Sequence, residues 1–157
     1  MIHVIKGDLL KSDCKVIGHQ VNCQGVMGAG IAKYVASRYP WAKEQYMDLC
    51  RKHSRNPAVL LGKAQVTCIA GGHSTWVVNL FGQVGYGRVG EHTVYPALEA
   101  ALHEMLGQIP QDYKVGLPYG IGCGLAGGKW EKVGSLIEQV ARRYNRDVYL
   151  YQLKGGK

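Results

Sequence analysis

The segment 21–32, VNCQGVMGAGIA, holds the residues whose types and spacing most clearly suggest chemistry. It lies between a short apolar run, Lys15–Val21, and a helix-like segment that begins near Gly30. Glycines in such a turn let the backbone approach an anion closely, and the following helix start presents free N–H groups to it. The segment therefore predicts a phosphate-binding turn, although many α/β loops are rich in glycine for conformational reasons alone.

Three more glycine-containing loops accompany this turn. GDL at 7–9 and GQVGYGRVG at 82–90 follow predicted strands, and GIGCGLAGG at 120–128 lies between a strand and a helix. In open α/β sheets ligands bind outside the carboxyl ends of the strands, so these loops would surround one crevice and favour a polyanionic ligand. The spacing matches neither a P-loop nor a dinucleotide-binding fingerprint.

The elements that must position these loops alternate along the chain. Apolar or alternating runs predict strands at Ile2–Lys6, Lys15–Val21, Leu61–Ile69, Trp76–Phe81, Val115–Pro118 and Asp147–Leu153. Helical spacing predicts helices at Gly30–Tyr39, Trp41–His53, Val94–Leu106 and Trp130–Tyr144. A turn at 70–72 would join two of the strands. The alternation predicts one layered α/β domain with a largely parallel or mixed sheet.

Composition sets the remaining bounds. A chain of 157 residues suits one domain, 1–153, followed by a short frayed tail at 154–157. The net charge of +8 favours anionic partners. The five cysteines form no CxxC pair and the histidines have no ligand spacing, so we expect reduced thiols, no metal and no cofactor. No apolar run reaches the roughly 18 residues that span a bilayer, and the N-terminus lacks a signal-peptide layout. We therefore expect a monomeric, cytoplasmic protein without a membrane partner.

Three motifs together resemble the macro domain family. They are KGDLL near the N-terminus, VNCQGVMGAGIA, and LPYGIGCGLAGGKWEKV, and the resemblance covers about residues 2–153. It implies a three-layer α/β/α sandwich with a mixed central sheet that binds ADP-ribose or its derivatives. The pattern His19-x-x-Asn22-Cys23-x-Gly25 is similar to the ADP-ribose 1″-phosphate phosphatases, in a branch that also holds terminal ADP-ribose glycohydrolases.

The resemblance assigns ligand-binding roles at both ends of the ligand. Asp8 would accept a hydrogen bond from the adenine amine, Leu9 would offer a nearby N–H, and Tyr151 would pack on the adenine. Asp8 could equally cap a turn, and Tyr151 could be an ordinary strand aromatic. The backbone around the diphosphate and distal ribose would come from Gly28, Ala29, Gly30 and Ile31 on one side and from Gly122, Cys123, Gly124 and Leu125 on the other.

The catalytic residues of the glycohydrolase branch are missing from this chain. That branch uses a lysine after the fifth strand and an acidic residue after GCGL. Here residues 79–83 read NLFGQ, and the residue after GCGL is Ala126. A lysine adduct with the opened ribose cannot form without the amine, so the resemblance to that branch does not extend to its chemistry.

His19 is then the best candidate for catalysis. Imidazole can act as general acid, general base or nucleophile near neutral pH, and Asn22 would hydrogen-bond the distal ribose. Alternation along a strand places His19 and Asn22 on opposite faces, and His19 could be a strand histidine satisfied by a neighbouring backbone group. Glu91 and His92 could also reach the pocket, or could form the first turn of a helix.

These residues predict removal of the terminal phosphate from ADP-ribose 1″-phosphate, with His19 and Asn22 at the reacting end. General RNA binding through the positive charge is a weaker possibility, and two stronger alternatives stay open. One is an ADP-ribosyl hydrolase that removes ADP-ribose from protein or nucleic acid. The other is a non-catalytic reader or sponge of ADP-ribose or of related signal nucleotides.

Overall fold

The computed structural model describes residues 1–69, 74–87 and 89–153. The turn expected at 70–72 and the frayed tail expected at 154–157 lie outside these residues. Within the described residues the strands are β1 (Ile2–Lys6), β2 (Val16–Val21), β3 (Ala64–Thr67), β4 (Trp76–Phe81), β5 (Val115–Pro118) and β6 (Val148–Gln152). The helices are α1 (Gly30–Arg38), α2 (Pro40–Lys52), α3 (Tyr95–Gln108) and α4 (Trp130–Arg143), with short 3₁₀ turns η1 (Leu9–Lys11) and η2 (Pro57–Leu60).

The strands form one sheet in the order β1-β6-β5-β2-β4-β3. Every neighbouring pair is parallel except β3 and β4, which are antiparallel, so the predicted mixed sheet is confirmed. Because the parallel strands run the same way, the segments that follow β1, β2, β4 and β5 leave the sheet at one edge. This is the edge at which the sequence predicts a ligand crevice.

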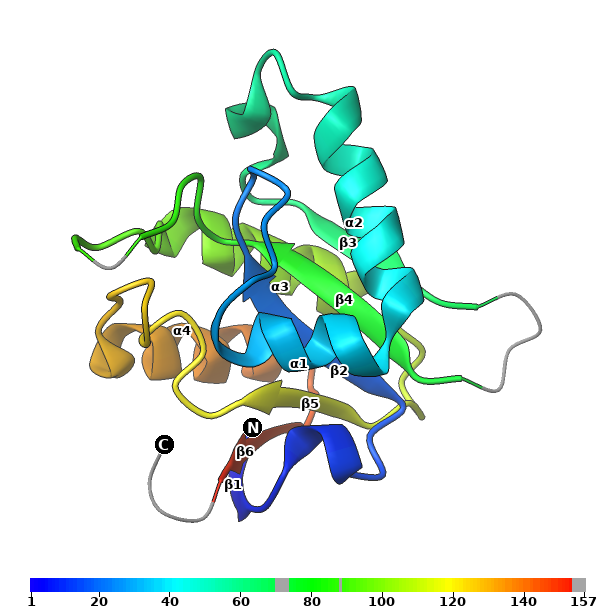
Figure 1. Cartoon of the computed structure of the whole chain (residues 1–157). Helices are drawn as coiled ribbons and strands as arrows, with labels where there is room; N and C mark the ends of the chain where they lie inside the picture. The colour runs from blue at the N-terminus through cyan, green and yellow to red at the C-terminus, as the bar shows by residue number, and fades with distance from the viewer. Residues whose placement is uncertain (70–73, 88, 154–157) are drawn as a thin grey trace.

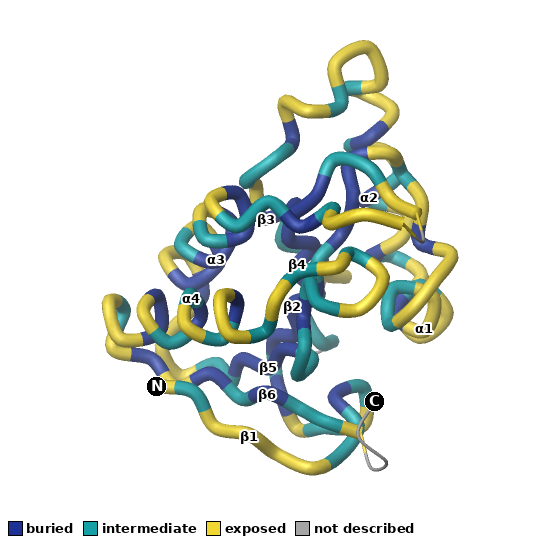
Figure 2. Tube along the Cα trace, turned by 90° about the vertical axis from the view of Figure 1, so that its left-hand side faces the viewer, coloured by how far each residue is buried: buried dark blue, intermediate teal, exposed yellow. Residues whose placement is uncertain are grey.

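Two apolar cores cover the two faces of the sheet, as the three-layer prediction requires. Leu98, Met105 and Ile137 lie in the core between the sheet and α3 and α4. Val35 and Tyr46 lie in the other core, beneath α1 and α2. Figure 1 shows how the two pairs of helices cover the sheet, and Figure 2 shows the buried residues concentrated along its middle strands. No helix in the described part of the chain is long and apolar enough to cross a membrane.

The largest boundary difference from the sequence prediction is at β3. The strand begins at Ala64 rather than Leu61 because η2 and a turn at Gly62 occupy the preceding residues. Gly62 has a φ of +91°, which favours glycine, and its N–H donates to the carbonyl oxygen of Phe81 at 2.8 Å. The polypeptide therefore turns before it pairs with β4.

Candidate functional site

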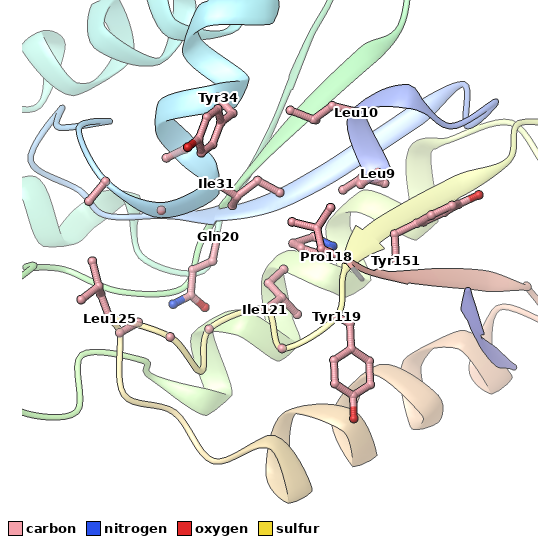
Figure 3. Close-up of a pocket in the computed structure, with 18 of the residues that line it drawn as sticks. Leu9, Leu10, Gln20, Ile31, Tyr34, Pro118, Tyr119, Ile121, Leu125 and Tyr151 are labelled. Carbon is pink, nitrogen blue, oxygen red and sulfur yellow. The ribbon is translucent and has the colours of Figure 1, made fainter. Parts of the chain in front are cut away.

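A cleft of about 510 Å³ lies at the carboxyl edge of the sheet. Its walls come from the segments 8–10, 29–34 and 118–126, together with Gln20, Gln83, Tyr151 and Leu153. Figure 3 shows Ile31 on one side and Ile121 on the other, with Leu9 and Tyr151 toward one end. The loops predicted from the sequence thus meet around one cavity.

Leu9 and Tyr151 lie at that end, and Asp8, which directly precedes Leu9, also lines the cleft. Asp8 lines the cleft and also caps η1, because its Oδ1 accepts a hydrogen bond from the Leu10 N–H at 3.0 Å. The Tyr151 hydroxyl lies 3.6 Å from Cys14 Sγ, and burial raises the pKa of this phenol. Tyr151 therefore stays neutral and offers an aromatic surface.

Gly116 on β5 makes room for this end of the cleft. A Cβ at this position would lie 2.7 Å from both Cys14 Sγ and Leu9 Cδ1, and 3.3 Å from the Tyr151 ring. Such contacts are too short for real side chains, so only glycine lets Leu9 and Tyr151 take their places.

The start of α1 forms one wall of the cleft. Its N-cap residue, Ala29, has an extended backbone and makes no side-chain capping bond, so the first-turn N–H groups of the helix stay open. Ala29, Gly30 and Ile31 line the cleft, whereas Gly28 does not. Gly28, predicted to contact the ligand, is exposed in the turn before the cap.

The loop 120–125 forms the opposite wall. Gly120 and Gly122 have φ values of +82° and +76°, which aim successive N–H groups in directions that other residues rarely allow. Within the described residues, the N–H groups of Gly122, Gly124 and Leu125 have no hydrogen-bond partner. These three residues line the cleft. The wall can therefore donate several backbone hydrogen bonds to an anion.

Cys123, predicted to contact the diphosphate through its backbone N–H, donates that N–H to the carbonyl oxygen of Gly120 at 2.9 Å and does not line the cleft. Its Sγ donates to the carbonyl oxygen of Ile121 at 3.5 Å and packs beside the α3–α4 core. Burial raises the pKa of the Cys123 thiol to about 11, so it is protonated at neutral pH.

His19, predicted to act at the reacting end of the ligand, lies in the protein core. Its side chain is fully buried and does not line the cleft. Nε2 lies 2.7 Å from Asn79 Oδ1, and Asn79 Nδ2 donates to Gln65 Oε1 at 3.1 Å. Burial lowers the pKa of His19 to about 4. The neutral imidazole is held at Nε2 by a side chain of the neighbouring strand, whereas its Nδ1 is buried without a hydrogen-bond partner among the described residues.

Asn22, predicted to hydrogen-bond the distal ribose, stabilises its own loop and does not line the cleft. Its Nδ2 donates to the carbonyl oxygen of Val26 at 2.9 Å. Its Oδ1 accepts from the Gln24 N–H at 2.9 Å and from the Tyr46 hydroxyl at 2.8 Å. Both polar atoms are used to close the turn that precedes α1.

Glu91 and His92 do not line the cleft and do not begin α3 either, since that helix starts at Tyr95. The Tyr95 hydroxyl donates to Glu91 Oε1. The His92 N–H donates to the carbonyl oxygen of Ala126, which joins the segment before α3 to the glycine loop.

Sequence reasoning missed several residues of the cleft. The most informative are Gln20, Gln83, Tyr34 and Tyr119. Strand alternation contained the signal for Gln20, because it places this side chain opposite the buried His19. Tyr34 lies one helical turn after Ile31 and so shares its face.

Only one charged side chain, Asp8, lines the cleft in the described part of the chain. An anion there would be held by backbone N–H groups and by the positive end of the α1 dipole, not by lysine or arginine.

The macro domain family model matches residues 19–137. The chain belongs to the macro domain family. It is 38% identical over 64 residues to an ADP-ribose 1″-phosphate phosphatase of Meyerozyma guilliermondii, and this match covers 39% of the chain and 37% of that protein. It is 42% identical over 52 residues to a DNA ADP-ribosyl glycohydrolase of Mycobacterium tuberculosis, covering 33% of the chain and 15% of that protein. The matches thus span well under half of these curated relatives.

The macro domain fold is also found in solved structures. The macrodomain of Mycobacterium tuberculosis DarG superposes with a TM-score of 0.80 at 26% sequence identity, over 96% of this chain and 97% of that chain. The macro domain prediction and its α/β architecture are therefore confirmed.

Proposed function

We propose that this macro domain binds ADP-ribose in the cleft and removes the terminal phosphate from ADP-ribose 1″-phosphate. The observation that carries the proposal is the order of groups along the cleft. An apolar end with one carboxylate is followed by two facing sets of unpaired N–H groups, at the start of α1 and in the loop 120–125. A nucleoside followed by a diphosphate presents complementary groups in the same order.

The adenine would lie between Leu9 and Tyr151. Asp8 uses one lone pair of Oδ1 on the Leu10 N–H, and a carboxylate has further acceptor sites for the adenine amine. The diphosphate would accept hydrogen bonds from both walls. The choice of the terminal phosphate as the reacting group is supported by the similarity to yeast ADP-ribose 1″-phosphate phosphatases.

The described lining of the cleft indicates how such a reaction would be accelerated. Water would attack the terminal phosphorus, the bond from phosphorus to the bridging oxygen would break, and the water proton would pass to that oxygen. The exposed Tyr34 hydroxyl is a polar group of the lining that could orient water, whereas Gln20 and Gln83 use their amide groups on each other and on neighbouring segments. Rate enhancement would then come from positioning and from N–H groups facing the phosphate charge, without a histidine nucleophile.

Phosphate release from ADP-ribose 1″-phosphate tests the proposal. We expect release above the buffer rate from the wild-type protein, and its loss in Ala29→Asp, which places a carboxylate where the diphosphate would lie. His19→Gln should keep the activity because His19 is outside the cleft. No release by a wild-type protein that binds ADP-ribose would contradict the phosphatase step and leave binding standing.

Binding without turnover is the second candidate. The described lining contains no histidine, lysine, glutamate or cysteine side chain, which favours a reader or sponge of ADP-ribose. Assays on ADP-ribosylated acidic protein side chains and on modified DNA ends would separate a reader from an ADP-ribosyl hydrolase. A monomeric state and a cytoplasmic location are further proposals, to be checked by light scattering and by cell fractionation.

A further inference from the structure

Gln20 connects three segments of chain beneath the cleft. Its Nε2 donates to Gln83 Oε1 at 2.8 Å and to Thr93 Oγ1 at 2.9 Å. Gln83 follows β4, Thr93 precedes α3, and Gln20 itself is on β2. Figure 3 shows the Gln20 side chain extending from β2 toward the loop that carries Ile121 and Leu125.

The hydrogen bonds fix which way each group points. Gln83 Nε2 donates to the carbonyl oxygen of Gly85 at 2.8 Å, so Gln83 turns its oxygen toward Gln20. The Thr93 hydroxyl donates to the carbonyl oxygen of Gly122 at 2.6 Å, so its lone pair faces Gln20. Both neighbours therefore require a donor, and only the amide nitrogen of Gln20 supplies it.

The other end of the amide is held by packing. Gln20 Oε1 is buried and has no hydrogen-bond partner within the described residues. A Cβ at Gly82 would lie 2.3 Å from this oxygen, and a Cβ at Gly122 would lie 3.0 Å from it. The close approach of Gly82 and Gly122 therefore confines the Gln20 amide to one place.

Thr93 carries the effect to the wall of the cleft. It holds the glycine loop at two points, because its hydroxyl donates to Gly122 and its N–H donates to the carbonyl oxygen of Ala126 at 3.1 Å. The unpaired N–H groups of Gly122, Gly124 and Leu125 lie between or beside these points.

We propose that Gln20 is a positioning residue that, through Thr93, sets the 120–125 loop so that its N–H groups face the diphosphate of ADP-ribose. The proposal rests on ADP-ribose binding as proposed above. It does not require Gln20 to touch the ligand.

Calorimetric titration with ADP-ribose and with AMP tests this role. AMP has the adenosine and a single phosphate, so the ratio of the two affinities reports on the diphosphate wall. We expect Gln20→Met, which keeps the length and loses the donor, to weaken ADP-ribose binding about tenfold and AMP binding less than about threefold. Thr93→Val should do the same, whereas Thr93→Ser keeps the hydroxyl and should bind like the wild type.

The double variant Gln20→Met with Thr93→Val should bind about as weakly as either single variant, because both act through one connection. Equal weakening of AMP and ADP-ribose, or wild-type affinities in both single variants, would overturn the proposal. Hydrogen exchange gives a ligand-free readout. The hydrogen-bonded loop amides of Cys123, Gly127 and Gly128 should exchange faster in Gln20→Met while the β2 amides keep their rates. Unchanged exchange at these three amides would count against Gln20 even if ADP-ribose failed to bind the wild type.

Discussion

At the scale of single residues, His19 and Gln20 show how one strand divides structural from ligand-facing roles. They are adjacent on β2, and alternation sends His19 into the core and Gln20 to the cleft. A histidine draws attention in a sequence because its chemistry is versatile. Its burial, and its hydrogen bond to Asn79 from another strand, depend on the tertiary fold and leave no local signal.

His19 makes stability depend on pH. Its pKa is lowered to about 4 in the fold, whereas the unfolded chain binds the proton near the ordinary value of 6.5. Its contribution is therefore complete above the unfolded pKa and is lost as pH falls toward 4, by up to about 3 kcal/mol. Urea denaturation at about pH 7 and about pH 4.5 should show a smaller loss in His19→Gln than in the wild type. Equal losses would mean that His19 titrates normally.

Asp8 caps η1 and is proposed to bind the adenine amine, and substitutions can separate these two roles. Asparagine is as good an N-cap as aspartate, so Asp8→Asn should leave stability nearly unchanged. It replaces one carboxylate oxygen with an N–H₂ group that faces the adenine amine. We expect ADP-ribose affinity to fall about tenfold by calorimetry. Asp8→Ala should lose affinity and melting temperature together. Wild-type binding by both variants would remove Asp8 from the adenine site.

At the scale of elements, the uncapped start of α1 should have opposite effects on stability and on ligand binding. A capping side chain there should stabilise the fold and weaken binding of ADP-ribose. Ala29 has the extended backbone of an N-cap but no side chain that can cap. Ala29→Asp should therefore stabilise the fold by about 0.5–1 kcal/mol through capping and the helix dipole. The same carboxylate should weaken ADP-ribose binding at least about tenfold by repulsion. Ala29→Asn is the matched uncharged cap, and it should stabilise with a smaller loss of binding. Unimpaired binding by Ala29→Asp would show that the diphosphate does not use this helix start.

The elements themselves were largely predictable because apolar periodicity and glycine-rich turns are local signals. The strands and helices occur near their predicted ranges, and β3 differs because η2 and Gly62 delay its start. The loops at 7–9 and 120–128 and the turn before α1 were located by their motifs, and residues from each of these segments line the cleft. The role of Asn22 in its own loop could not be predicted. Its partner Tyr46 lies 24 residues away on α2, and no spacing in the sequence reveals that contact.

At the scale of the whole molecule, the positive net charge and the groups that line the cleft should affect ADP-ribose binding separately. The chain carries +8, yet no lysine or arginine lines the described cleft. ADP-ribose affinity should then change by less than about threefold between about 50 and about 300 mM NaCl, because fixed N–H dipoles in a partly enclosed site are weakly screened. Calorimetry across this series measures it. A steep fall of the kind seen for nucleic-acid binding through basic side chains would contradict the absence of charged ligand contacts.

The most direct test of the account is a titration with ADP-ribose followed by amide chemical shifts in a ¹⁵N-labelled protein. The two walls of the cleft predict that the amides of Gly30, Ile31, Gly122, Gly124 and Leu125 shift most and saturate together at one ligand per chain. Shifts confined to other surfaces, or no saturable shifts, would contradict the assignment of this cleft to ADP-ribose.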